Sequence, residues 1–464
     1  MSCEVICCEI PEILHALVET GNGAFLDKLF TFLDTSHSLD YYLAGYFEKI
    51  LEMLFRRMTV PMMKYFNDAG VSLLVKFLEH MDNYSIMQIV QRLMLPHIPF
   101  ANLNDNDADF TEEERILRQC NWSFSTESCE LLFNRMLEQK DADVPLHISD
   151  LLITVLQLSP PETLVISYLC EPSCVENLMR AIVGDVSENG EECAMLDIAL
   201  PGDAYSSAAS VSLAAISVLE SLNSRLFEAS LPFDQSMSQI MEDNQDHLVV
   251  VREQIEVVCQ QILPFIPRLQ AILHQYLECS PCQPIVNQSK TQVNRLGHRG
   301  LQLVKLVESI VRMGSVAVDE SFCRSGLFRT CLDLYFHFDN NSFLHLSVQR
   351  IVITVLESDS SRRYIYLKVY LEIVNPNLPY LWFCSATQRH LLTECGLLDT
   401  LMSGIEKYTT TPSSKLDASS NQGVDDSSDA KPPTTGNRVG MTPKHSSIMG
   451  NLVLIAQVFT IFDT

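Results

Sequence analysis

Apolar residues recur at intervals of three and four along most of the chain, and this spacing constrains the fold more than any other feature. Residues 41–58 show the pattern, with apolar positions at Tyr42, Leu43, Tyr46, Phe47, Ile50, Leu51, Leu54, Phe55 and Met58. The charged side chains in the same stretch fall on the other face of a helix: Glu48, Lys49, Glu52, Arg56 and Arg57. An amphipathic helix of this kind must bury its apolar face against a neighbouring element.

The same spacing returns towards the C-terminal end of the sequence. Residues 301–312 carry it through Leu303, Val304, Val307, Ile310 and Val311, and residues 343–356 through Phe343, Leu344, Val348, Ile351, Val352 and Val355. No stretch keeps up the strict alternation of apolar and polar side chains that a half-buried strand requires. The 464 residues include only 17 glycines, which is few for a turn-rich β fold. We therefore predict an all-α fold.

The helical segments follow one another through short loops, without a fixed period. Segments begin alike at Gly70, Gly326 and Gly396, where a glycine at the corner is expected to let two helices approach closely. Helix pairs that bury their faces only against their neighbours are typical of repeat proteins. The predicted architecture is an armadillo/HEAT-like helical-repeat solenoid.

Polar stretches interrupt this pattern and suggest how the chain is divided. The shorter interruptions lie at residues 101–114, 184–206 and 230–246. The longest, residues 409–446, is rich in Ser, Thr, Pro, Asp and Gly and cannot bury enough apolar surface to offset the entropy of the chain. We expect a helical-repeat domain over residues 1–408, a disordered internal insertion over 409–446, and the final helix of the same domain within 447–464.

Two threonines in the predicted insertion, Thr411 and Thr442, are each followed by proline. They are candidate phosphorylation sites for proline-directed kinases, and a phosphate there would add negative charge to a flexible loop. The same dipeptides are also ordinary linker composition, and the sequence leaves both interpretations open.

The charge balance restricts the partners of the chain. With 32 basic and 58 acidic residues, the net charge is −26, which repels nucleic acid phosphates and anionic lipids and favours basic protein surfaces. The first residues lack the basic and apolar regions of a signal peptide, and no apolar run approaches the ~18 residues of a membrane span. The 15 cysteines are therefore expected to be reduced thiols of a cytoplasmic or nuclear protein that does not insert into membranes.

Signatures of catalysis are missing from the sequence. It contains no phosphate loop, dinucleotide glycine fingerprint, zinc-binding His-Glu-x-x-His or nucleophile elbow. The Asp-rich stretch 105–109 is followed by Phe110 and Ile116, where a calcium loop requires Gly and Glu. Cys279 and Cys282 form an isolated Cys-x-x-Cys without further zinc ligands nearby, although a redox pair stays open. We expect no catalytic residue, no metal site and no cofactor.

Two histidines, His337 and His345, flank an aromatic helix junction. In one interpretation they cap or pack against a helix turn. In the other they belong to a polar patch that is presented to a partner. No nucleophile stands near them in the sequence, so catalysis is the weakest interpretation.

An ordered series of motifs spans nearly the whole chain. It starts with Cys8-Glu-Ile-Pro-Glu-Ile-Leu-His-Ala-Leu and Leu43-Ala-Gly-Tyr-Phe-Glu-Lys-Ile50 and ends with Cys395-Gly-Leu-Leu and Met449-Gly-Asn-Leu-Val-Leu. The most specific segment runs from Leu296 to Val348 and contains Asn340-Asn-Ser-Phe-Leu-His-Leu. In these motifs the chain resembles the SAPS-domain family, regulatory subunits of serine/threonine phosphatases of the protein phosphatase 6 type.

The resemblance implies a helical-repeat scaffold that binds a phosphatase catalytic subunit and directs it to substrates. It also implies an ankyrin-repeat protein as a further partner, and no catalytic activity. Family members usually continue into a long acidic tail, so the resemblance implies that this chain is short for its family.

The polar residues of the motifs are the candidates for contact with a partner, because the apolar ones are expected to serve packing. The candidates are Lys49, Arg324, Asn340, Asn341, His345 and Arg350, and the expected packing residues are Gly45, Phe47, Leu332 and Phe343. Two alternatives stay open: a helical-repeat adaptor of another signalling or transport pathway, and a thiol- or zinc-dependent enzyme built on the cysteines.

Overall fold

The fold is taken from a computed structural model of the chain. It describes residues 2–18, 23–94, 125–138, 140–159, 163–184, 207–231, 243–278, 282–286 and 292–357. The chain divides into two compact units: unit 1 is Met1–Gln283 with Leu296–Ser325, and unit 2 is Pro284–Arg295 with Gly326–Thr464.

Helices make up almost all of the described part of unit 1. In chain order they are α1 (Ser2–Ile6), α2 (Pro11–Val18), α3 (Ala24–Phe30), η1 (Thr31–Leu33), α4 (Tyr41–Arg57), α5 (Thr59–Ala69), α6 (Val71–Glu79), α7 (Tyr84–Met94), α9 (Thr126–Leu137), α10 (Asp143–Leu158), α11 (Leu164–Leu169), α12 (Pro172–Val183), α13 (Ser207–Ser230), α14 (Asp243–Ile262), η4 (Leu263–Phe265), α15 (Ile266–Glu278), α16 (Gly297–Arg312) and α17 (Val316–Ser325).

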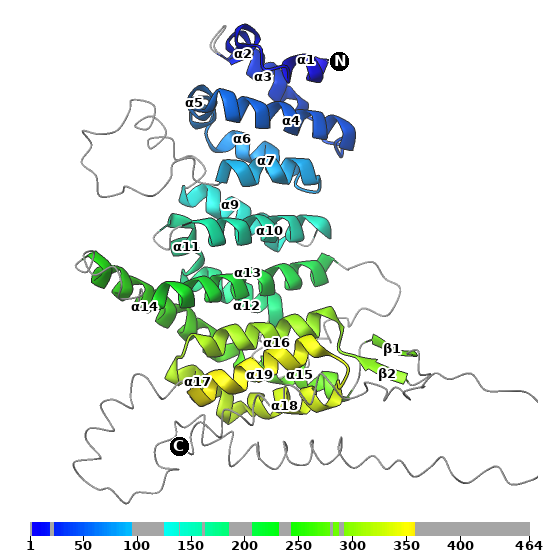
Figure 1. The fold of residues 1–464 in the computed structure, drawn as a ribbon, viewed down its shortest axis with the longest axis vertical. Coiled ribbons are helices and arrows are strands. Elements are labelled where there is room, and N and C mark those ends of the chain that lie inside the picture. The colour runs from blue at the N-terminus through cyan, green and yellow to red at the C-terminus, as the bar shows by residue number, and fades with distance from the viewer. Residues whose placement is uncertain are drawn as a thin grey trace, which may run out of the picture. The chain divides into compact units, whose positions relative to one another are not determined.

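The helices of unit 1 are stacked in two rows. In the first row α4, α7, α10, α13 and α16 contact one another in succession, and Figure 1 shows them as consecutive rungs from blue to yellow-green. In the second row α6 contacts α9, and the contacts continue through α11 and α12 to α15. Neighbours in sequence, such as α9 and α10 or α12 and α13, pair across the rows. This arrangement confirms the prediction of an all-α helical repeat.

The core lies where the two rows meet. The first row depends on α13, whose side chains from Val211 to Leu226 are mostly buried against α10, α12 and α16. Near the N-terminus, the ring of Phe30 lies 5.7 Å from Phe47, 5.5 Å from Phe66 and 6.1 Å from Phe77, measured between centroids. These rings are nearly perpendicular to Phe30, the edge-to-face geometry that aromatic pairs prefer.

Three arginines connect helices that are not neighbours in sequence, and we call them the arginine latches. Arg135 of α9 donates from Nε to the Leu78 carbonyl at the end of α6, at 3.2 Å. Arg225 of α13 donates to the carbonyl of Ser159, which caps α10, at 2.8 Å. Arg299 of α16 donates to the Ile182 carbonyl at the end of α12, at 3.0 Å. Carbonyls at a helix C-terminus lack partners within the helix and carry its negative dipole, so each latch satisfies a helix end.

Two expectations about the backbone are wrong. Gly70 and Gly326 begin α6 and α18 with φ of 62° and 76°, but a Cβ at either position would meet nothing within 4 Å. Glycine is needed there for the left-handed backbone and not for close approach of two helices. In addition, the sequence showed no strand, yet β1 (Cys282–Val286) pairs with β2 (Gln292–Arg295). These strands are too short for their side-chain pattern to be recognised.

The described helices of unit 2 are α18 (Leu327–His337) and α19 (Ser342–Glu357), which contact each other. The apolar positions expected in this region are buried, including Leu332 at 3% and Leu344 at 0% exposure. Phe343 is an exception, because 68% of it is exposed. The predicted insertion 409–446, the final helix within 447–464 and the Gly396 segment lie outside the described residues.

The cysteines whose side chains the structure describes form no disulfide with one another. Cys129, Cys170 and Cys259 are at most 5% exposed, and burial raises the pKa of each thiol to about 12. Cys8, in contrast, is exposed. Among the described residues, no helix combines the length and the apolar character that crossing a membrane requires.

The cysteines give a first prediction, since thiol reactivity follows exposure and thiolate content. In the folded protein, iodoacetamide at neutral pH is expected to alkylate Cys8 well before Cys129, Cys170 and Cys259. Mass spectrometry of peptides from timed samples measures this order, and a urea-unfolded sample serves as the control in which the difference disappears. Equal rates at Cys8 and Cys129 in the folded protein would contradict the packing described here.

The start of α4 gives a second prediction. The Oδ1 atom of Asp40 accepts hydrogen bonds from the backbone N–H groups of Tyr42 at 2.9 Å and Leu43 at 3.0 Å. Replacing Asp40 by Ala is expected to lower the free energy of unfolding by about 0.5–2 kcal/mol, whereas Asn at this position preserves the cap. Chemical denaturation of the two variants and the parent measures the difference. An Asp40→Asn variant as unstable as Asp40→Ala would show that the cap is not the cause.

Candidate partner-binding surface

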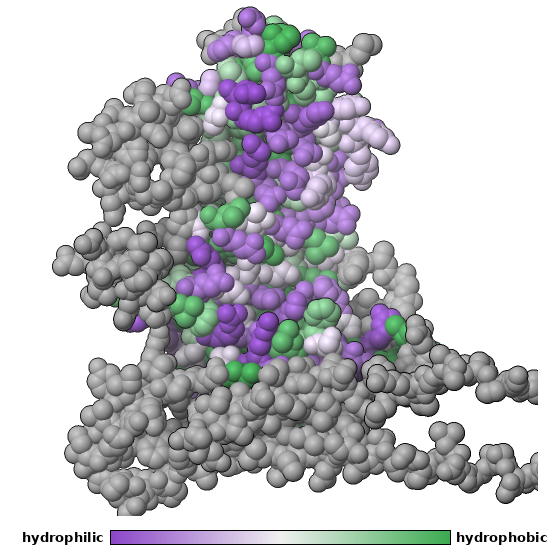
Figure 2. Space-filling view, viewed as in Figure 1, coloured by the Kyte–Doolittle hydropathy of each residue, from purple (hydrophilic) through white to green (hydrophobic). Residues whose placement is uncertain are grey.

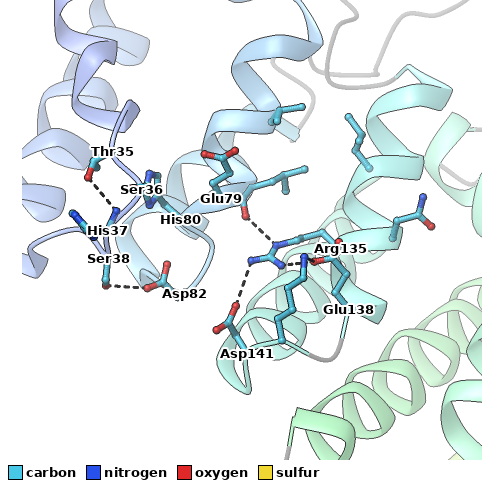
Figure 3. A pocket seen from close by; sticks show the side chains of 15 residues that line it. Thr35, Ser36, His37, Ser38, Glu79, His80, Asp82, Arg135, Glu138 and Asp141 are labelled. Atoms are coloured by element: carbon cyan, nitrogen blue, oxygen red, sulfur yellow. Dashed lines mark hydrogen bonds and ion pairs between the residues drawn. The ribbon is translucent and has the colours of Figure 1, made fainter.

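A hollow lies in unit 1 between the loop after η1, the end of α6, and α9 (Figure 3). Its volume is about 690 Å³, and its apolar floor is formed by Val75, Leu78 and Leu131. Its rim is polar and includes His37, Glu79, Asp82, Arg135, Glu138, Lys140 and Asp141. The hollow lies where α6 and α9, neighbours in the second row, meet beside the loop 34–40.

One wall of the hollow is organised by Arg135. Its guanidinium donates from Nη1 to Glu138 Oε2 at 2.5 Å and lies 3.4 Å from Asp141 Oδ2, in addition to the latch to Leu78 (Figure 3). Lys140 approaches the same Glu138 oxygen at 3.1 Å. Hydrogen bonds from Lys140 and Arg135 lower the pKa of Glu138, so this carboxylate is ionised at neutral pH.

The other wall is built by the loop after η1 and the end of α6. Ser38 donates to Asp82 Oδ2 at 3.2 Å, and Nε2 of the buried His80 lies 3.1 Å from the Leu33 carbonyl. Four carboxylates line the hollow: Glu79, Asp82, Glu138 and Asp141. Its permanent cations are two, Arg135 and Lys140. The hollow therefore offers carboxylate oxygens to a cationic group of a partner. The Thr35 hydroxyl accepts from the backbone N–H of His37 at 3.2 Å and not from its ring, so among the described lining residues this pair is not the imidazole-activated nucleophile that nucleophilic catalysis needs.

The candidate partner contacts predicted from the sequence lie in different parts of the structure. Lys49 is exposed on α4 and Arg324 is exposed near the end of α17, both in unit 1. In unit 2, Asn340 and Asn341 lie between α18 and α19, and Arg350 is exposed on α19. Asn340 and Asn341 therefore lie together at the α18–α19 junction, and Arg350 lies further along α19. Asn341 also has a structural role, because its Oδ1 accepts from the Leu344 N–H at 3.1 Å and caps α19.

The expected surface position of His345 is wrong. Its side chain is 0% exposed, and its Nε2 lies 3.1 Å from the Tyr335 carbonyl, which ties α19 to α18. Burial lowers the pKa of the ring, although the backbone carbonyls of Tyr335 and Phe338 oppose this effect. The histidine is therefore a packing residue at a helix junction, as one of the two sequence interpretations proposed. His337, by contrast, is exposed.

A second error concerns the start of α4. Tyr42, Leu43 and Tyr46 were expected on the buried face, but they are 81%, 54% and 54% exposed. The neighbouring Tyr41 is 72% exposed. The buried positions of α4 include Ala44, Phe47, Leu51 and Leu54, so the tyrosines lie off that stripe. Phe47 is buried as predicted.

Sequence reasoning missed the hollow entirely. Its residues come from the segments 35–38, 75–82 and 131–141, and no motif connects them. The exposure of the start of α4 could have been recognised from the sequence. Ala44, Phe47, Leu51 and Leu54 already repeat every three and four positions, so they form a complete buried stripe without the tyrosines.

Other predicted features lie outside the described residues. They are the phosphorylation candidates Thr411 and Thr442, the Asp-rich stretch 105–109 and Cys279. The described residues hold no group of three or more His, Cys, Asp and Glu side chains placed to bind a metal ion.

The hollow gives a third prediction. Replacing Arg135 by Ala removes the latch to Leu78 and leaves Glu138 and Asp141 without their guanidinium partner. The free energy of unfolding is expected to fall by about 1–3 kcal/mol, because a partly buried acceptor and two acids lose a charged donor. The measurement is urea denaturation followed by circular dichroism.

Arg180 supplies the matched control for this test. It pairs with Glu176 one turn away on α12 at 2.6 Å, with half of its side chain exposed. An exposed pair of this kind contributes about 0.3–0.5 kcal/mol, so Arg180→Ala should be nearly neutral. Equal effects of Arg135→Ala and Arg180→Ala would contradict the role of the latch.

Comparison with known proteins adds to this geometry. The family model described as SAPS, SIT4 phosphatase-associated protein, matches residues 51–423. The chain is 24% identical to serine/threonine-protein phosphatase 6 regulatory subunit 1 of Homo sapiens over 424 residues, covering 88% of this chain and 42% of the relative. It is 22% identical to human regulatory subunit 2 over 368 residues, which cover 76% of this chain and 33% of the relative.

A third relative is regulatory subunit 3-B of Xenopus laevis, 22% identical over 364 residues that cover 77% of this chain and 38% of the relative. The chain therefore spans less than half the length of these curated relatives. No solved structure matches the chain at a comparable level of significance.

Proposed function

Because the chain belongs to the SAPS family of SIT4 phosphatase-associated proteins, we propose that it is a regulatory subunit that binds the catalytic subunit of a protein phosphatase 6-type enzyme and directs it to substrates. The observation that carries the proposal is the family match over residues 51–423, supported by relatives named as regulatory subunits of protein phosphatase 6. The chain itself is proposed to have no catalytic activity.

The architecture supports a binding role. Stacked helices expose a long series of helix faces and loops on a rigid frame, which is how repeat proteins bind partners. Figure 2 shows that the visible face over α4 to α13 is largely hydrophilic, with isolated hydrophobic groups. The net charge of −26 favours basic surfaces on partners. The carboxylates of the hollow beside Arg135 suit such a surface as well.

The proposed contacts keep the exposed polar candidates of the sequence. They are Lys49, Arg324, Asn340 and Arg350, with Asn341 contributing as the cap of α19. His345 is proposed to act only through its packing, since it is buried. An ankyrin-repeat protein as a further subunit, phosphorylation at Thr411 and Thr442, and a cytoplasmic or nuclear location belong to the same proposal.

A binding experiment tests the proposal directly. The purified chain is immobilised, and a recombinant catalytic subunit of the protein phosphatase 6 type is passed over it. We expect saturable binding, with an association rate that falls as salt rises, because charges steer the encounter. Circular dichroism confirms in parallel that the immobilised protein is folded.

Two controls make the result decisive. An unrelated protein of similar negative charge should not retain the phosphatase, and a phosphatase activity assay of the chain alone should give no signal above buffer. A folded chain that does not bind the catalytic subunit would overturn the proposal. Recovery of other partners from cells, without a phosphatase, would favour the adaptor function instead.

A further inference from the structure

We propose that the exposed start of α4 is the surface on which the phosphatase catalytic subunit docks. We call this surface the α4 stripe, formed by Tyr42, Tyr46 and Lys49 with Tyr41 and Leu43 at its edges. The inference rests on the proposed function and adds a location and a chemistry to it.

The spacing of these residues makes them one continuous strip. Tyr42, Tyr46 and Lys49 stand at intervals of four and three, so they lie above one another on the helix. The stripe faces away from the buried positions Ala44 and Leu51, which are 0% exposed. It therefore projects from unit 1 while the opposite face of α4 is held in the core.

The same face of α4 is open at one end and covered at the other. Seven residues beyond Tyr46, Met53 occupies the equivalent position and is only 4% exposed. The helix α1 contacts α4 at the middle of this face, where the Sγ of Cys3 donates to the backbone carbonyl of Tyr46 at 3.8 Å and leaves the tyrosine side chain 54% exposed. The apolar face thus continues from a buried half into an open half, and the open half contains the tyrosines.

The stripe is also rigid. Asp40 caps the helix at Tyr42 and Leu43, and Phe47 and Leu51 anchor the next turns in the core. A partner that docks there would order little backbone, which lowers the entropy cost of binding. Tyrosine has only two rotatable side-chain bonds and combines an apolar ring with a polar tip, so it is enriched at protein interfaces.

The charges around the stripe define the partner. Lys49 is exposed, and the group on which its charge acts is the Cys7 thiol of α1, whose pKa it lowers against the raising effect of burial. The nearby acids point elsewhere: Glu48 and Glu52 line a separate groove of about 280 Å³ between α4 and α7, where Glu52 lies 3.7 Å from Arg92. The partner should therefore offer an apolar groove for two tyrosine rings, with a carboxylate at its end for Lys49. A protein surface fits this description, whereas a nucleic acid or an anionic membrane would be repelled by the −26 charge of the chain.

The test measures the affinity of the full chain for the recombinant catalytic subunit by biolayer interferometry. The variant Tyr42→Ala/Tyr46→Ala is expected to bind about tenfold or more weakly, since interface tyrosines each contribute on the order of 1–2 kcal/mol and 1.4 kcal/mol is tenfold. The variant Lys49→Glu is expected to weaken binding about three- to tenfold, mainly through a slower association rate.

Matched controls come from the same chain. Lys64→Glu makes the same charge change at an exposed lysine of α5, and Leu158→Ala removes an apolar side chain that is 59% exposed at the end of α10. Both should stay within about twofold of the parent if the stripe is the docking surface, because residues outside an interface contribute little. Thermal unfolding of every variant should match the parent, since the substituted side chains are exposed.

The outcomes separate this inference from the proposed function. If the parent binds and both stripe variants bind equally well, the stripe is not the docking surface, although the proposed function stands. If Leu158→Ala weakens binding as much as the double tyrosine variant, the location is also wrong. If the double variant abolishes self-association of the chain in sedimentation but leaves phosphatase binding unchanged, a second copy covers the stripe and the inference fails. If the folded parent does not bind at all, the proposed function itself is overturned.

Discussion

The stacking of unit 1 depends on hydrogen bonds that arginines donate to backbone carbonyls at the C-terminal ends of other helices. Arg135, Arg225 and Arg299 form them between α9 and α6, α13 and α10, and α16 and α12. Apolar packing alone would tolerate a helix sliding along its neighbour. A buried charged donor fixes the end of one helix to the side of another, because leaving the guanidinium or the carbonyl without a partner is costly. Asn223 of α13 adds a similar constraint, since it is 0% exposed and donates to Ser309 of α16 at 3.1 Å.

This stacking explains how a chain of paired helices can present specific binding surfaces. The helices of the first row bury the faces that meet their neighbours on either side and in the second row, and the remaining faces and loops form the surface. The polar hollow beside Arg135 and the aromatic α4 stripe are two such places, with opposite chemistry. One offers carboxylates to a cationic group, and the other offers rings and a lysine to an apolar, acidic-edged surface. A scaffold that holds both in place suits the binding of partners, which agrees with membership of a family of phosphatase-associated proteins.

The sequence predicted the parts of this structure that depend on local periodicity. The spacing of Leu303, Val307 and Ile310 placed them correctly in the core, because one face of a helix is defined by its own residues. The same kind of spacing wrongly placed Tyr42 and Tyr46 in the core. Helical spacing identifies the apolar stripes of a helix, but it does not show which stripe a neighbouring helix covers. The latches and the hollow could not be predicted, because they depend on which distant helices stack. His345 looked like a surface residue for the same reason: only the contact of α18 with α19 buries it.

Hydrogen–deuterium exchange of the chain, alone and with the phosphatase catalytic subunit, tests this account most directly. The account predicts slow exchange throughout α10, α13 and α16 in the free chain, since these helices are held by neighbours on both sides. Addition of the catalytic subunit should then slow exchange in residues 40–50 and leave the stacked helices unchanged. A complex that forms without any change in residues 40–50, or fast exchange of α13 in the free chain, would contradict it.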